Sequence, residues 1–169
     1  MKKASFFLIL LIIFSVISLG AQVGSRHTER NGNFSFSPPA NWTAMTMPGL
    51  SYSVFMGPVI GSFQPNMNIV DEHYDGSLPE YVELSILSLR AIFSDASTLQ
   101  NEVFRTSSGI SGFKTVTVYT MSGMQLCAVQ YYFSNGSRKY VMTYSALNSN
   151  IGDFQGIFDE SARTFQFLR

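Results

Sequence analysis

The richest cluster of side chains that could carry chemistry is the run Asp71-Glu72-His73-Tyr74-Asp75. In an extended chain, side chains two residues apart project to the same face, so Asp71, His73 and Asp75 would lie together. Carboxylate oxygens and an imidazole nitrogen suit a divalent ion such as zinc or manganese. No second histidine or spaced ligand pair accompanies the run. Charged side chains that solvate the end of a strand are therefore the simpler interpretation.

His73 is the only histidine after the N-terminal segment, so a Ser-His-Asp hydrolase would have to use it. No Gly-x-Ser-x-Gly motif follows a predicted strand, and no glycine-rich loop could hold a phosphate. Glu80 and Glu83 lie on one edge of a predicted helix, which favours capping and surface roles. We therefore expect a non-enzymatic protein without a cofactor. A metal-dependent or hydrolytic enzyme centred on His73 is the alternative.

Cys127 is the only cysteine of the chain, so no intramolecular disulfide can form. The predicted strand places Cys127 on the same face as Val129, Tyr131 and Phe133. A reactive thiol needs an accessible, electropositive environment, and no histidine or lysine lies close to Cys127 in the sequence. The pattern therefore indicates a buried thiol and not a nucleophile.

The segment from Met45 to Met67 is rich in methionine, aromatic and aliphatic residues interrupted by glycine and proline. Such side chains are common in adaptable binding surfaces, although they also form the core of small domains. The loop from Gly57 to Pro65 contains Val59, Ile60 and Phe63. We expect these three residues to form a partner-binding site if the loop exposes them.

The start of the chain has the composition of a bacterial secretory signal peptide: two lysines, an apolar stretch and then small residues. The apolar stretch is shorter than the roughly 20 residues that a membrane span needs, and no cysteine is available nearby for a lipid anchor. We expect residues 1–21 to be removed on export, residues 22–32 to be a flexible lead, and residues 33–169 to form one domain. The predicted location is the periplasm or the outside of the cell, with no stable membrane anchor after cleavage.

The charge balance restricts the class of partner. Loss of the two lysines of the signal peptide would leave nine lysines and arginines against eleven acidic residues. Nucleic-acid-binding domains normally carry excess positive charge on one face. The sequence therefore excludes a nucleic-acid partner, and we expect a protein partner in the cell envelope or outside the cell.

The hydrophobic period alternates between that of strands and that of helices along the chain. The capping box Ser77-Leu78-Pro79-Glu80 predicts the start of a helix, in which apolar side chains recur at helical spacing as far as Phe93. Asn135-Gly136 between two β-rich runs predicts a tight hairpin. The predicted strands cover residues 33–37, 42–47, 52–56, 66–73, 99–106, 112–121, 124–133, 139–146 and 165–167, and a second helix begins near residue 150.

This order of elements predicts an α+β fold. A mostly antiparallel β-sheet would be flanked by helices on both faces, as an α/β/α sandwich. Residues 140–144 are apolar enough on both faces to predict a central strand of that sheet. Trp42, the only tryptophan, is predicted to be anchored in the core.

Segments spread over nearly the whole chain after the signal peptide carry a resemblance to a known family. They are Phe34-Ser35-Phe36 followed by Pro39-Ala40-Asn41-Trp42, then residues 65–70, 77–82 and 112–116, the hairpin of residues 130–133 and 139–144, and residues 164–167. Together they resemble the PsbP-like superfamily, whose fold is shared by extrinsic photosystem proteins, a Ran-binding nuclear protein and DcrB-type exported bacterial proteins. The resemblance implies an α/β/α sandwich and a protein that binds or stabilises a larger partner. We therefore expect an exported, non-catalytic binding or accessory protein.

Overall fold

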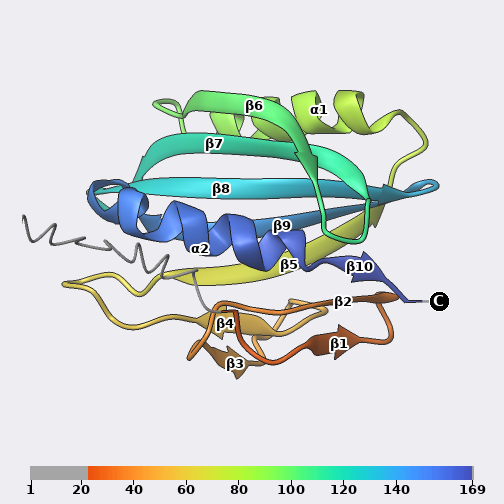
Figure 1. Ribbon diagram of the computed structural model, residues 1–169. Helices are drawn as coiled ribbons and strands as arrows, with labels where there is room; N and C mark the ends of the chain where they lie inside the picture. The colour runs from red at the N-terminus through yellow and green to blue at the C-terminus, as the bar shows by residue number, and fades with distance from the viewer. Residues whose placement is uncertain (1–22, 169) are drawn as a thin grey trace, which may run out of the picture.

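The computed structural model describes residues 23–168, so the predicted signal peptide of residues 1–21 lies outside the described residues. The described part contains ten β-strands, two α-helices and one short 3₁₀ helix (Figure 1). The strands are β1 His27–Glu29, β2 Phe34–Phe36, β3 Thr43–Met45, β4 Val54–Met56, β5 Asn66–His73, β6 Ser97–Arg105, β7 Ser111–Met121, β8 Met124–Asn135, β9 Arg138–Leu147 and β10 Gln166–Phe167. The helices are α1 Leu78–Ile92 and α2 Ile151–Arg163, with the 3₁₀ turn η1 Asn148–Asn150 before α2.

The larger sheet has seven strands in the order β3-β4-β5-β9-β8-β7-β6, and every pair is antiparallel. Two-residue turns join its longest strands. Ser122 and Gly123 both have positive φ angles, of 52° and 78°, between β7 and β8, which is the backbone of a tight hairpin that follows the strand twist. Gly136 (φ 60°) turns β8 into β9. The hairpin predicted at Asn135-Gly136 and the central position of β9 are both confirmed.

The two helices cover opposite faces of this sheet, with α2 in front and α1 behind it in Figure 1. Neighbouring residues of a strand point to opposite faces. Tyr131 therefore packs in the cluster that contains α2, and Tyr132 packs against α1. The capping box at Ser77 forms as predicted, with the Ser77 N–H donating to the Glu80 carboxylate and the Glu80 N–H donating to the Ser77 hydroxyl. The predicted α/β/α arrangement is confirmed.

A second sheet of three strands, in the order β1-β2-β10, closes the core below α2. Ser35 of β2 pairs with Gln166 of β10, so the end of the chain is joined to the start of the described part. Phe34 and Phe36 of β2 are fully buried. Their alternation with Ser35 is the pattern from which the sequence predicted this strand.

The segment before β2 differs from the expected flexible lead over residues 22–32. His27 and Glu29 lie in β1 and pair with β2. The ring of His27 packs edge-on against Phe55 at 5.0 Å between centroids, and its Nε2 contacts the Glu29 carboxylate at 2.8 Å. The three residues of β1, His-Thr-Glu, show no apolar alternation, and the order of this strand comes from its pairing with β2 and from the packing of the His27 ring.

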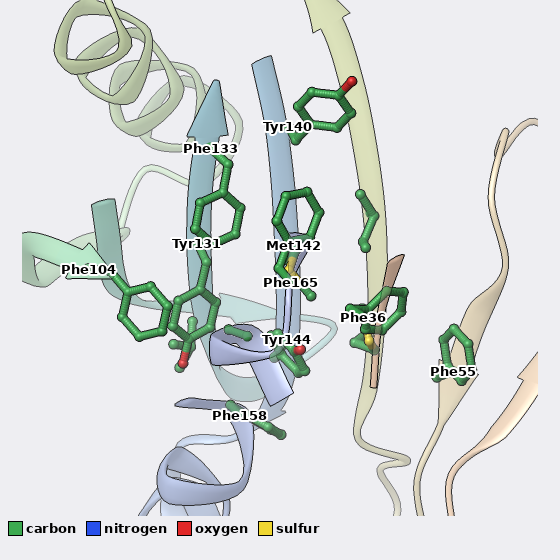
Figure 2. Packing of buried hydrophobic residues seen from close by; sticks show 14 of the residues in the cluster. Phe36, Phe55, Phe104, Tyr131, Phe133, Tyr140, Met142, Tyr144, Phe158 and Phe165 are labelled. Carbon is green, nitrogen blue, oxygen red and sulfur yellow. The ribbon is translucent and has the colours of Figure 1, made fainter. Parts of the chain in front are cut away.

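The main core is a continuous aromatic cluster between the larger sheet, α2 and β2 (Figure 2). Cys127 is buried in this cluster together with Val129, Tyr131 and Phe133, as predicted. Burial raises the pKa of the Cys127 thiol to about 11. The thiolate that nucleophilic chemistry needs is therefore scarce at neutral pH.

Gly156 occupies an interior position of α2, and a Cβ built on it would meet no atom within 4 Å. Glycine costs roughly 0.5–1 kcal/mol relative to alanine inside a helix because it loses more backbone entropy on folding. Gly156→Ala is therefore expected to raise the free energy of unfolding by up to about 1 kcal/mol in urea denaturation. A loss of stability would show that the glycine backbone is needed at this place.

Candidate functional site

The residues of the predicted metal cluster are not all free to act together. Asp71 lies in β5, where its Oδ1 accepts a hydrogen bond of 2.7 Å from the Tyr52 hydroxyl and its Oδ2 pairs with Arg138. Burial and the bond to Asp71 raise the pKa of Tyr52 to about 12, so the phenol remains a donor. Both carboxylate oxygens of Asp71 therefore already have partners within the protein.

His73 and Asp75 form an exposed pair beyond Asp71. Their Nε2 and Oδ1 atoms lie 2.9 Å apart, and the two side chains are 70% and 86% exposed. Within residues 23–168, no three side chains of His, Cys, Asp or Glu come together as a potential metal site. Metal binding at Asp71, His73 and Asp75 stays a prediction.

That prediction has a direct test in metal analysis and thermal denaturation. A metal that binds only the folded protein stabilises it by about 2.7 kcal/mol at a hundred times its dissociation constant. If the site exists, zinc or manganese raises the melting temperature of the wild-type protein by several degrees and leaves that of His73→Ala unchanged. Absence of co-purified metal together with equal melting temperatures with and without added ion would refute it.

The loop from residue 57 to residue 65 presents its three predicted contact residues unequally. Val59 is 67% exposed. Ile60 and Phe63 are partly buried and exchange two backbone hydrogen bonds, of 2.8 and 3.1 Å, around a turn in which Gly61 has a φ of 60°. Ile60 packs against the main core, and Phe63 packs against the cluster around Tyr119. Ile60 and Phe63 therefore anchor the loop, and Val59 is the member that faces solvent.

Val59 borders a hollow of about 620 Å³ between the loop, Trp42 and the first half of α2. We call this hollow the Trp42 groove. Its lining contains no charged side chain. The residues that line it are Ala40, Asn41, Trp42, Thr43, Met56, Gly57, Pro58, Val59, Gln64, Phe154 and Ile157. A site with this lining can take an apolar group and hold it by area rather than by charge.

Trp42 is a partly buried wall of this groove and packs against the main core, where the sequence predicted it to be anchored. Its indole meets Phe158 edge-on, at 5.9 Å between centroids. Asn41, the residue before Trp42, has a φ of 65°, so the chain turns at this point. Gly57 packs directly against the indole, because a Cβ at that position would lie 2.7 Å from the ring.

A smaller hollow of about 320 Å³ adjoins the Trp42 groove, since Asn41 and Trp42 line both hollows. We call it the Arg26 groove. Its lining residues are Gly24, Ser25, Arg26, His27, Pro38, Pro39, Asn41, Trp42, Ala44 and Phe55. Arg26 is exposed and donates from Nη1 to the Ser35 hydroxyl at 3.1 Å and to the Thr164 carbonyl at 3.4 Å. Sequence reasoning missed this groove because residues 24–27, which line part of it, were expected to belong to a flexible lead.

Gly57→Ala is expected to push the indole of Trp42 outward, because the new methyl group would occupy its place. Overpacking of this kind typically costs about 1–3 kcal/mol. Trp42 is the only tryptophan, so its emission spectrum reports this movement alone. We expect a shift of the emission maximum to longer wavelength. Gly156→Ala, the same substitution at an open position, should leave the spectrum unchanged. Identical spectra for both variants would contradict the packing of Trp42 on Gly57.

No helix within residues 23–168 is long and apolar enough to cross a membrane.

No protein-family model matches the sequence, and no curated protein matches it by sequence. Solved structures do match the fold. The cyanobacterial PsbP protein (CyanoP) of Synechocystis sp. PCC 6803 is 14% identical, with a TM-score of 0.65 over 92% of this chain and 98% of its own.

Two further structures have the same fold. LpqN, which is involved in cell envelope biogenesis of Mycobacterium tuberculosis, is 12% identical, with a TM-score of 0.65 over 86% of each chain. The Ran-binding protein Mog1p of Saccharomyces cerevisiae is 10% identical, with a TM-score of 0.61 over 87% of this chain and 97% of its own. The PsbP-like fold predicted from the sequence is confirmed.

Proposed function

We propose that this protein is an exported, non-catalytic binding or accessory protein. Its partner would be a protein of the cell envelope or of the space outside the cell. The binding surface would consist of Val59 and the Trp42 groove. The observation that carries the proposal is a highly exposed valine at the rim of an uncharged groove, on a loop that Ile60 and Phe63 fix to the core.

A rigid apolar rim of this kind supports protein binding on physical grounds. Protein interfaces are typically centred on aromatic and aliphatic side chains that are desolvated on contact. Here Trp42 is already held in place by Gly57 and Phe158, so little side-chain entropy is lost when a partner covers it. Binding roles also occur among proteins of this fold, because Mog1p is a Ran-binding protein. The signal-peptide composition of residues 1–21 supports export.

The test is photo-crosslinking in native cell envelopes with a photoreactive amino acid at one position. Position 59 is compared with position 103, because Val103 is equally exposed, at 71%, but lies on the edge strand β6 at the far end of the sheet order from β3. We expect a discrete crosslinked product of higher mass from position 59 and none from position 103. Recovery of only the free monomer from position 59 would refute the proposal.

A charged side chain at position 59 gives a second test of the same proposal. Val59→Asp would place a carboxylate at the proposed contact, where it would lose its hydration. We expect this variant to fold normally, because Val59 is exposed, and to reduce capture of the partner found by crosslinking by at least tenfold. Val103→Asp is the matched control and should capture the partner as the wild type does. Equal capture by the two variants would place the interface elsewhere.

A further inference from the structure

We infer that the partner presents an extended peptide segment to Trp42, with an apolar side chain in the Trp42 groove and an aspartate or glutamate side chain in the Arg26 groove. This inference rests on the proposed function and specifies the chemistry of the partner. It follows from the two hollows that share one indole, of which one is uncharged and the other contains an arginine.

The apolar half of the site is defined by the groove lining. Met56, Phe154 and Ile157 line the Trp42 groove together with the indole, and its polar lining consists of neutral side chains such as Gln64. The Gln64 amide already donates to the carbonyl of Gly57 at 2.8 Å. Burying a charged or strongly polar group here without partners would be costly. An aliphatic or aromatic side chain is therefore the group that fits.

The charged half of the site is defined by Arg26. Among residues 23–168, no carboxylate lies within ion-pair distance of its guanidinium, and only its Nη1 donates hydrogen bonds. The nearby Glu29 carboxylate is already engaged, because it accepts from His27 at 2.8 Å and from the Ser53 N–H at 3.3 Å. An arginine with free N–H groups matches a carboxylate in both charge and geometry.

The shared wall sets the spacing of the two groups. In an extended peptide, side chains at positions i and i+2 point to the same face about 7 Å apart, which allows one side chain to enter each of the two hollows that Trp42 lines. An apolar-x-acidic peptide satisfies both grooves with a single strand.

The experiment titrates purified protein with three synthetic peptides and follows the emission of Trp42. The peptides are Ac-Gly-Leu-Ser-Glu-Gly-NH2, its Glu-to-Gln analogue and its Leu-to-Ala analogue, none of which contains tryptophan. We expect a saturable change with the first peptide. An exposed ion pair contributes up to about 1 kcal/mol, so the Gln analogue should bind a few-fold more weakly, about fivefold at most. The Ala analogue should lose most of the binding, because its methyl group cannot fill the uncharged Trp42 groove.

Two arginine variants locate the carboxylate. Arg26→Gln should bind the Glu and Gln peptides equally, whereas Arg90→Gln, an exposed arginine on α1, should discriminate between them as the wild type does. Equal binding of the Glu and Gln peptides by the wild type, discrimination retained in Arg26→Gln, or no saturable change with any peptide would overturn the inference. A crosslink from position 59 would survive any of these results, so the proposed function can stand when this inference fails. Peptide binding without that crosslink would show that the two grooves bind such a peptide, and it would refute the proposed envelope partner.

Discussion

Asp159→Ala is expected to lower the free energy of unfolding by about 3–5 kcal/mol, because it would leave a buried ammonium group without its counter-charge. Lys114 of β7 is only 3% exposed, and its Nζ lies 2.7 Å from Oδ1 of Asp159 on α2. The same Oδ1 accepts a hydrogen bond of 2.5 Å from the Tyr131 hydroxyl. The Asp159 carboxylate therefore pairs with both the Lys114 ammonium group and the Tyr131 hydroxyl. Asp159→Ala would leave both groups without this partner.

Urea denaturation of two further variants separates this effect from the loss of one surface charge. Asp153→Ala removes an exposed aspartate from the first turn of the same helix and should cost less than about 1 kcal/mol. The double variant Lys114→Met with Asp159→Ala should recover much of the lost stability, because the buried charge is gone as well. If Asp159→Ala costs no more than Asp153→Ala, the pair does not hold α2 on the sheet.

This ion pair illustrates what the sequence could not reveal. Lys114 lies on the same strand face as Val116, inside a segment correctly predicted to be a strand. A lysine at such a position suggests a surface residue until its partner is known. That partner lies 45 positions later in the chain, on α2, which packs over β8 and β9, and no local pattern connects Lys114 to Asp159.

Local signals, by contrast, predicted most elements. The capping box at Ser77 and the hairpin at Asn135-Gly136 act through residues a few positions apart, so the sequence contains the whole interaction. The Trp42 groove is different. It depends on contacts of Trp42 with Gly57 and Phe158, and the adjoining Arg26 groove depends on the pairing of β1, which contains no apolar period. The sequence indicated the loop that contains Val59. The position of Trp42 as a wall of the groove, and that of Arg26 beside it, could be seen only in the folded chain.

Phe165→Ala is expected to destabilise the protein by about 3–5 kcal/mol, the typical cost of removing a fully buried phenylalanine. Phe165 follows the end of α2 and is fully buried. Its ring stacks on Phe133 of the larger sheet at 4.5 Å between centroids, and on Phe34 of the smaller sheet at 5.5 Å. The substitution would thus leave a cavity between the two sheets.

The position of this cavity predicts which part of the Phe165→Ala variant would unfold locally. Apart from the Phe165 ring, the chain end is tied to the β2 region by the short pairing of β10 with β2 and by bonds such as that from the Leu168 N–H to the Asn33 carbonyl at 3.0 Å. Backbone amides of β1 and β2 in Phe165→Ala should therefore exchange with deuterium faster than those of β7. Phe93→Ala is the matched control, because Phe93 stacks on Tyr119 at 4.4 Å but lies on the α1 face and is only partly buried. It should cost less and leave β2 exchange unchanged. Uniform acceleration across both sheets in Phe165→Ala would mean that the smaller sheet unfolds only with the whole protein. In that case the Arg26 groove would be as stable as the core beneath it.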